Sequence, residues 1–164
     1  MYGYKILDMS QFIKARPNES KFYYHFIRGG YYSTSTSKIF IPMAGAEDLR
    51  EGTSLTSLSE KFCFICAYDG SFEKAYARSE NGCDSSVFGF YTIADSAGTE
   101  IPSATATQSV TVDMSAANTS YEFDFASAGT NTFSKGNILS FSFDPTNAPL
   151  DVHFMIVLKF DVST

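Results

Sequence analysis

The sequence predicts an all-β fold, an antiparallel two-sheet β-sandwich of jelly-roll type with an N-terminal arm or extra strands. Runs in which apolar and polar residues alternate recur along the chain, and turn residues separate them roughly every 8–12 residues. No amphipathic stretch long enough for a helix of about 12 residues is visible. Phe and Tyr occur 16 and 10 times with no Trp, and aromatic residues suit a half-buried pleated surface.

The first third of the chain contains three runs that predict strands. They are Tyr2–Met9, which is a strand or an arm, then Lys21–Ile27 and Lys38–Ile41. Arg28-Gly29-Gly30 is expected to close the second run, and Pro42 stops the third, because proline cannot donate to a strand ladder. The Ser/Thr tract at 31–37 is a linker or an exposed edge, and the polar stretch Ala44–Ser59 is a long loop.

The middle of the chain predicts further short strands joined by tight turns. These strands are Lys61–Tyr68, Ser71–Glu80, Ser86–Ile93, Ala104–Met114 and Tyr121–Phe125. Asp69-Gly70 and Asn81-Gly82 are two-residue hairpin signals, since both turn positions require a positive φ. The polar segment Ala94–Ser103 is a loop.

The last 27 residues predict a β-hairpin. Residues 138–143 alternate, Asp144, Pro145 and Asn147 supply the turn, and residues 152–160 alternate again. In the second run every even position is apolar and the odd positions are polar except for Met155 and Val157, which predicts that the face of the strand with the even positions is buried. The residues at the even positions are Val152, Phe154, Ile156, Leu158 and Phe160.

Length and charge limit the classes of function. At 164 residues one compact domain is the default, divided into an arm or first strands over residues 1–37 and a sandwich over residues 38–164. Residues 1–80 hold ten Lys/Arg and nine Asp/Glu, whereas residues 81–164 hold two and nine. Nucleic-acid binding needs a clustered basic surface and is not expected. No apolar run of signal-peptide or membrane-spanning length is present, so a protein made in the cytosol with no membrane partner is expected.

No residue pattern predicts catalysis, a metal or a cofactor. Cys63 and Cys66 have C-x-x-C spacing, but residues three apart on a strand point to opposite faces. They and Cys83 are therefore expected to be buried thiols, although a role for the three cysteines stays open. The two histidines, His25 and His153, lie in strand-like runs without a hydrolase signature, and the protein is not expected to be an enzyme.

The tyrosines are the better functional signal. Tyr23, Tyr31, Tyr32, Tyr76 and Tyr91 are many for one small core, and tyrosine is favoured where one end of a side chain is dry and the other wet. Tyr23, Tyr31 and Tyr32 are therefore candidate interface aromatics. The alternative, that each packs beneath a loop, is equally open.

The chain after residue 37 resembles small virion structural proteins of marine tailed bacteriophages. The segments that carry the resemblance are Lys38–Pro42, Cys66–Glu80, Val87–Tyr91, Val110–Phe125, Phe133–Leu139 and Asp144–Val152. The resemblance implies a β-sandwich carried on the virion as a capsid decoration protein or a fibre-type protein. It also implies synthesis in the host cytoplasm, a homo-oligomer, with a trimer favoured, and the major capsid protein or other virion proteins as partners.

Three hypotheses follow. In the first the protein decorates and stabilises a capsid, anchored by a basic N-terminal region comprising Lys5, Lys14, Arg16, Lys21 and Arg28, which could equally be a solvated face. In the second it is a fibre or tail module whose loops Ala44–Ser59 and Ala94–Ser103 bind host glycans, with Tyr31 and Tyr32 as stacking faces. The third, a hydrolase that uses His25 or His153, has no supporting motif.

Overall fold

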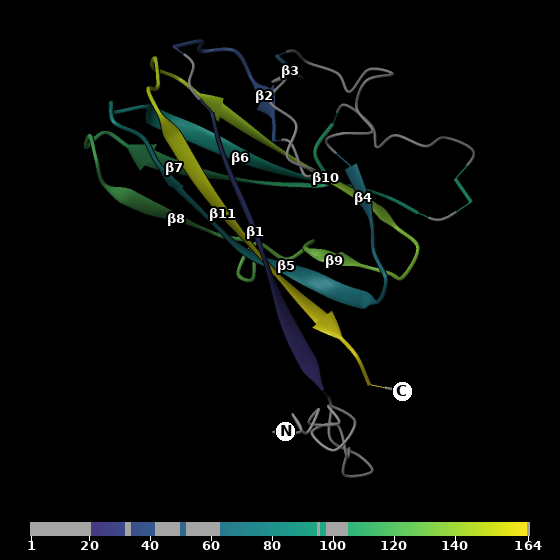
Figure 1. The fold of residues 1–164 in the computed structure, drawn as a ribbon. Helices are drawn as coiled ribbons and strands as arrows, with labels where there is room; N and C mark the ends of the chain where they lie inside the picture. The colour runs from purple at the N-terminus through teal and green to yellow at the C-terminus, as the bar shows by residue number, and fades with distance from the viewer. Residues whose placement is uncertain are drawn as a thin grey trace, which may run out of the picture.

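The structure is a computed structural model that describes residues 21–31, 34–41, 50–51, 63–94, 96–97 and 105–163. All regular structure in these ranges is β (Figure 1). The strands are β1 (Phe22–Tyr31), β2 (Ile39–Phe40), β3 (Arg50–Glu51), β4 (Cys63–Ile65), β5 (Asp69–Arg78), β6 (Asp84–Ile93), β7 (Gln108–Met114), β8 (Ser120–Asp124), β9 (Thr132–Phe133), β10 (Ile138–Pro145) and β11 (Val152–Asp161). These ranges hold no helix of the length and apolar character needed to cross a bilayer.

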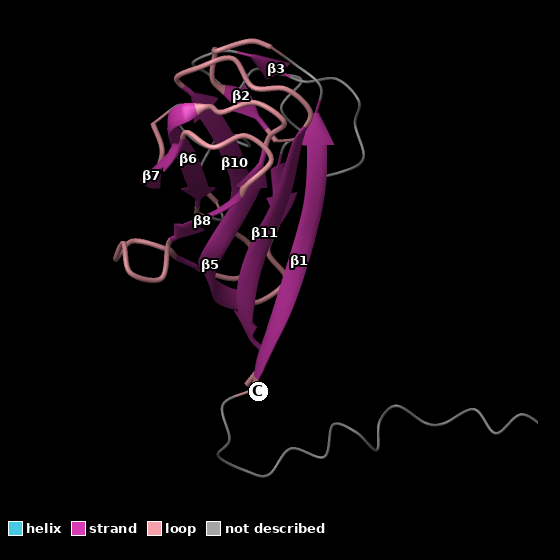
Figure 2. Cartoon of the chain, turned by 90° about the vertical axis from the view of Figure 1, so that its left-hand side faces the viewer, coloured by secondary structure: helices cyan, strands magenta, loops and turns pink. Residues whose placement is uncertain are grey.

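The strands form two antiparallel sheets that pack face to face (Figures 1 and 2). One sheet has the order β1-β11-β5-β8, with β9 also pairing with β5. The other has the order β3-β2-β10-β6-β7, with β4 also pairing with β10. When the short strands β3, β4 and β9 are left out, the remaining eight strands can be counted from first to eighth along the chain. The strands of one sheet then lie in the order first, eighth, third, sixth, and those of the other sheet in the order second, seventh, fourth, fifth. This is the strand order of a jelly roll, so the predicted fold class is confirmed.

The core between the sheets is built mainly from phenylalanine. The ring of Phe72 on β5 lies with its centroid 4.1 Å from that of Phe125 and 4.9 Å from that of Phe141. It also lies 5.4 Å from Phe90 and 6.1 Å from Phe88, both on β6 of the opposite sheet. All five side chains are fully buried. Phe72 therefore joins the two sheets through offset and edge-to-face ring contacts.

Alternation predicted the buried face of the last strand correctly. The five even-numbered apolar residues of β11 are buried and belong to the core. Phe88 and Phe90 on β6 are likewise in the core, as their common parity predicts. Val157, on the opposite face of β11, is also nearly buried at 9% exposure.

The predicted C-terminal hairpin is wrong. β10 pairs with β6, β2 and β4, whereas β11 pairs with β1 and β5 in the other sheet. Asp144 and Pro145 belong to β10, and the bend follows at residues 146–147. Six residues separate the strands, Thr146 to Asp151, and this link crosses from one sheet to the other. Alternation predicts a buried face, but it does not specify which sheet the face belongs to.

The two segments that were predicted as two-residue hairpin turns do not form such turns. Asp69 and Gly70 begin β5 after a bend at residues 67–68, and neither has a positive φ. Asn81 and Gly82 lie in the link from β5 to β6, which again changes sheets, and neither has a positive φ. A Cβ on Gly82 would stand 2.3 Å from the carbonyl oxygen of Ser115. This glycine therefore serves close backbone approach rather than a hairpin turn.

A small second cluster covers the outer face of β6. Tyr91 and Phe40 are almost fully buried with ring centroids 5.3 Å apart. The Tyr91 hydroxyl shares a hydrogen bond of 2.9 Å with the Ser142 hydroxyl, directly above Gly89, where a Cβ would lie 2.6 Å from the Ser142 oxygen. Tyr91 is therefore structural and is not part of an exposed aromatic surface.

The part of the chain before residue 37 contributes one described strand to the sandwich. β1, which precedes residue 37, pairs with β11 over its whole length. Arg28, Gly29 and Gly30 continue this strand and do not close it. The expected strand or arm at residues 2–9 lies outside the described residues.

We predict that Phe72→Ala lowers the free energy of unfolding by about 3–5 kcal/mol, because it removes the ring that contacts both sheets. Urea denaturation followed by far-UV circular dichroism measures this loss. The matched control is Phe26→Ala, which truncates a phenylalanine that is 55% exposed and should change stability by no more than about 0.5 kcal/mol. Equal losses in the two variants would contradict the assignment of Phe72 as the centre of the core.

Candidate interaction surface on strand β1

Strand β1 forms one border of its sheet. β11 is its neighbour on one side, and no described strand pairs with the other side. Figure 2 shows β1 running along the margin of the sandwich, with its first half extending beyond β6, β7 and β10 of the other sheet. A long strand of this kind presents unpaired N–H and C=O groups along its free edge.

The residues with these free groups follow from the strand register. The Val162 amide donates a 2.9 Å hydrogen bond to the Lys21 carbonyl, so residues 21 and 162 are a hydrogen-bonded pair. Hydrogen-bonded and non-hydrogen-bonded pairs alternate along an antiparallel ladder. With Phe22 opposite Asp161 and Tyr24 opposite Lys159, the even residues of β1 are the non-hydrogen-bonded ones. Their N–H and C=O groups therefore point away from β11.

Four aromatic side chains of β1 are exposed on the two faces of the strand. Phe22, Tyr23, Tyr24 and Phe26 are 49%, 57%, 49% and 55% exposed. The even-numbered three lie on the outer face of the sheet, because the odd-numbered Ile27 packs against the core. Tyr23 shares the inner face with Ile27, but it belongs to the first half of β1, which extends past β6, β7 and β10 of the other sheet (Figure 1). This half of β1 is therefore aromatic on both faces.

Neighbouring side chains hold these rings in place. The Lys159 ammonium lies 3.9 Å from the centroid of the Phe22 ring, within the range of a cation–π contact. Tyr23 lies 6.3 Å from His25 between ring centroids, and His25 lies 6.1 Å from Phe160. Phe22, Tyr23, Tyr24 and Phe26 thus form an exposed aromatic row on β1, in which Phe22 is held by Lys159 and Tyr23 is linked through His25 to the core residue Phe160.

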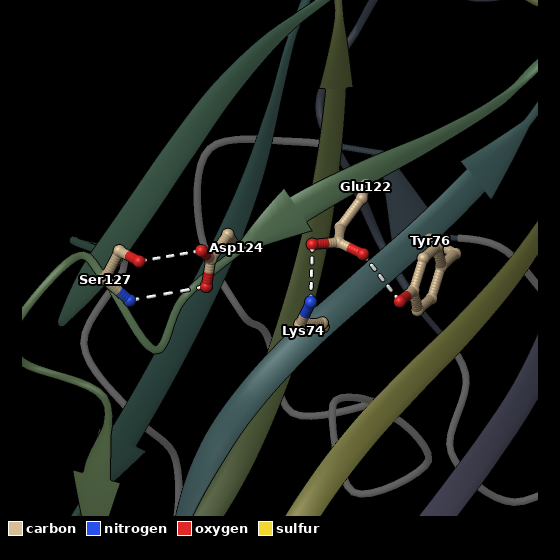
Figure 3. A network of polar contacts seen from close by, with 5 residues as sticks. All are labelled: Lys74, Tyr76, Glu122, Asp124 and Ser127. Atoms are coloured by element: carbon tan, nitrogen blue, oxygen red, sulfur yellow. Dashed lines mark hydrogen bonds and ion pairs between the residues drawn. The ribbon is translucent and has the colours of Figure 1, made fainter.

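The outer face of the same sheet turns polar away from β1. Figure 3 shows Glu122 of β8 accepting hydrogen bonds of 2.6 Å from the Lys74 ammonium and from the Tyr76 hydroxyl, both on β5. Asp124 accepts bonds from the Ser127 hydroxyl at 2.7 Å and the Ser127 amide at 3.3 Å. The hydrogen bonds from Lys74, the largest cause, and from Tyr76 lower the pKa of the Glu122 carboxyl. The hydrogen bond from the Ser127 hydroxyl lowers the pKa of the Asp124 carboxyl.

A half-open depression of about 430 Å³ lies where β5 ends and β11 begins, at the opposite end of β11 from Val162. Its polar lining includes Tyr76, Arg78, Glu80, Asn118, Asp151 and His153. Asn118 has a φ of 57°, a conformation that asparagine tolerates, and its amide groups donate to the Ser79 and Glu80 carbonyls. The backbone around this depression is therefore well defined.

Only some of the residues predicted to form an interface, an anchor or a glycan site lie in the described part of the chain. Tyr23 is exposed on β1, and its place at an interface stays a prediction. Lys21 immediately precedes β1 and Arg28 is exposed on it, whereas Lys5, Lys14 and Arg16 lie outside the described residues. Tyr32 and the side chain of Tyr31 are also outside them, as are Ala44–Ser59 apart from the backbone of residues 50–51 and most of Ala94–Ser103.

The histidines do not converge. His25 lies opposite Leu158, and His153 lies opposite Gly30, five positions along the same ladder. His25 shares the parity of the inner face and His153 that of the outer face. No shared site is formed by these two residues.

The cysteines are free thiols on separate elements. Cys63 is in β4 and half-buried, Cys66 follows β4, and Cys83 precedes β6. Burial raises the pKa of the Cys66 thiol to about 12 and also raises the pKa values of Cys63 and Cys83. Among the described residues no group of three or more His, Cys, Asp or Glu is placed to hold a metal ion.

Sequence reasoning missed Phe22, Tyr24 and Phe26 as surface residues. The available signal is that Lys21–Ile27 carries aromatic residues at both parities. A strand that is aromatic at both parities is either buried on both faces or exposed on one. The edge position of β1 decides between these possibilities, and that position is a property of the sheet order.

No protein-family model and no curated protein matches the sequence. Among solved structures, the chain is similar to a protein of Bacillus endospore appendages described as disulfide-linked pili, with a TM-score of 0.41 and 12% identity over 91% of this chain and 96% of that one. It is similar to a chain of infectious bursal disease virus, Gx strain, with a TM-score of 0.42 and 11% identity, covering 93% of this chain and 37% of that one. It is also similar to a chain of the empty cowpea mosaic virus particle, with a TM-score of 0.32 and 10% identity over 91% of this chain and 90% of that one. Likenesses of this degree do not identify a function.

We predict that the Glu122 carboxyl titrates below the ordinary glutamate value, because its ionised form accepts the Lys74 and Tyr76 hydrogen bonds. The contribution of these bonds to stability is then present above the ordinary pKa and is lost as the pH falls through the lowered pKa. An NMR titration of the side-chain carboxyl carbon measures the midpoint. Lys74→Met should move the midpoint upward, and the distant control Lys135→Met should not. A wild-type midpoint at the ordinary value would contradict the network.

Proposed function

We propose that the protein is a structural component of a virus particle, a capsid decoration protein that binds and stabilises the shell. The observation that carries the proposal is the exposed aromatic and basic face of β1. Phe22, Tyr24 and Phe26 stand on this face, with Lys21 just before the first of them and Arg28 just after the last. Exposed aromatic residues and arginine are enriched at protein interfaces.

Charge supports a docking role for this strand. Residues 21–31 contain Lys21 and Arg28 and no Asp or Glu, whereas the whole chain has a net charge of −6. β1 is therefore a basic segment on an acidic protein, and it is complementary to an acidic surface on another protein. Charge complementarity of this kind orients two proteins as they meet, while the aromatic residues supply buried area after contact.

The fold suits a role in which the protein bears load and does no chemistry. Jelly rolls recur in viral capsid domains, and function on such a fold is decided by its surfaces. The phenylalanine core ties the two sheets together through Phe72, which gives β1 a rigid support. The resemblance of the chain after residue 37 to phage virion proteins adds the virion as the location and the major capsid protein or other virion proteins as partners.

We predict that the purified protein binds capsids of its own virus that lack it, and raises the temperature at which they open. The double variant Lys21→Glu, Arg28→Glu should weaken this binding by about tenfold or more, since two attractive charges become repulsive. Co-sedimentation measures the binding, and the thermal release of capsid DNA to a fluorescent dye measures the stabilisation.

The matched control for this experiment is Arg78→Glu, Lys135→Glu, which reverses the same number of exposed charges away from β1. It should bind like the wild type. If the wild-type protein fails to associate with such capsids, the decoration role is refuted. If both double variants lose binding equally, the role stands, but β1 is not its docking surface.

Glycan recognition is the second candidate, and the polar depression beside β5 favours it. Its lining offers the Tyr76 ring with Arg78, Glu80 and Asn118, and jelly rolls also occur as lectin domains. Planar aromatic and amide groups with charged neighbours can hold the hydroxyl groups of a sugar. The protein would then act as a fibre or tail module that contacts the host surface.

Glycan-array and host-cell binding tests separate this candidate from the first. Binding through the depression predicts a signal that Arg78→Ala abolishes, because that side chain lines the depression. Lys135→Ala, which removes an exposed cation outside the depression, should keep the signal. Silence of the wild-type protein on both the array and the cells would eliminate glycan recognition.

A further inference from the structure

We propose that the free edge of β1 is a self-association site, at which β1 of a second copy of the chain adds in antiparallel orientation. The two sheets would become one continuous sheet across a two-fold axis. This inference concerns the backbone edge of β1 and does not depend on the virion assignment. The side-chain face of β1 remains available to another partner.

The unpaired groups of β1 define which residues take part. Phe22, Tyr24, Phe26, Arg28 and Gly30 direct their N–H and C=O groups away from β11, as the Val162–Lys21 hydrogen bond and the register require. In a two-fold pair, even residues must therefore lie opposite even residues. A shift of one position would place these groups opposite residues whose own groups are already bonded to β11.

One register uses all five residues. When Phe26 lies opposite Phe26 of the second copy, Tyr24 lies opposite Arg28 and Phe22 lies opposite Gly30, so every outward-directed group of the strand has a partner. A centre at His25 leaves Gly30 without an opposite residue within β1, and a centre at Ile27 leaves Phe22 without one. The strand sequence thus favours the axis at Phe26.

The side chains in this register are complementary. Phe26 meets the same ring across the axis on the outer face, and aromatic cross-strand pairs stabilise antiparallel sheets. Arg28 meets the Tyr24 ring and not a second arginine, so no like charges lie directly opposite each other. Phe22 and Tyr23 fall opposite Gly30 and Gly29, where an aromatic ring can cover the bare backbone.

Nothing on the strand blocks such an addition. Natural edge strands are commonly protected by inward-pointing charges, proline, bulges or a short length. β1 has ten residues and no proline, and its pairing with β11 runs without a register shift. The other border of the sheet ends in β8, which has five residues and carries Glu122 and Asp124. The β1 edge is therefore the more open of the two borders.

Sedimentation velocity of the purified wild-type protein, without capsids, tests the inference. We expect a dimer that dissociates on dilution. Phe26→Pro should give a monomer, because the ring replaces an outward-directed N–H and leaves the bonds to β11 intact. Phe26→Ala keeps that N–H and should weaken the dimer by no more than about tenfold.

A second variant covers the case in which Phe26→Pro does not fold, which its thermal unfolding would reveal. Phe26→Lys places two ammonium groups opposite each other on the axis and should also give a monomer. The control Thr111→Lys adds the same charge at an exposed position of β7, the border strand of the other sheet. It should remain a dimer.

Cross-linking tests the register. Under a short bis-maleimide, Phe26→Cys should give a covalent dimer, since the two residues lie opposite each other. Arg28→Cys should not, because its copies would be about 13 Å apart along the strands. The raised pKa values of the three native thiols keep their background reaction low.

A wild-type protein that is monomeric at all concentrations, or that is a trimer, would overturn the inference. So would a dimer that survives both Phe26→Pro and Phe26→Lys, or cross-linking at residue 28 without cross-linking at residue 26. A dimer that fails to bind capsids leaves the inference standing and refutes the decoration role. A monomer that binds capsids does the reverse: it refutes the inference and leaves the decoration role standing.

Discussion

The stack of phenylalanine rings between the two sheets is the contact on which the rest of the molecule depends. Phe72 reaches across from β5 and contacts rings of β6 and β10 in the opposite sheet. Among the described residues, eight of the eleven largest fully buried side chains are phenylalanines, and all of these except Phe40 belong to the core between the sheets. When the short strands β3, β4 and β9 are left out, most strands that follow each other in the sequence lie in opposite sheets. Such strands are therefore held together by these ring contacts and not by the hydrogen bonds of a hairpin.

The exposure of β1 follows from where this core ends. Ile27 and residues after it lie over the second sheet, since Ile27 packs against the core and Gly29 approaches Ile41. The first half of β1 extends beyond β6, β7 and β10 of that sheet (Figure 2), and Tyr23 there is 57% exposed although it is on the inner face. The same strand is therefore a core element at one end and a surface at the other.

Local pattern predicted the strands and the buried faces well, and the connections poorly. The even-numbered apolar residues of β11 are buried as predicted, and Phe88 and Phe90 of β6 share one buried face. These predictions were correct because alternation of apolar and polar residues reports directly on burial. The hairpin between β10 and β11 was wrong, because a turn sequence does not show whether the chain returns to the same sheet or crosses to the other. Tyr23 was predicted at an interface, whereas its even-numbered neighbours were missed because their exposure depends on the order of strands in the sheet.

The bond between Val162 and Lys21 has a practical consequence for anyone who modifies this protein. It closes the ladder where β1 begins and β11 ends, so the described chain starts and stops at the same pole, beside the exposed Phe22 and Tyr23. A reporter attached at Ser163 would therefore lie next to the aromatic row and compete for the space around it. The turn at 126–130, which follows β8 and has exposed residues, offers a better position for a peptide epitope. The position of a label thus decides whether it obscures the β1 surface.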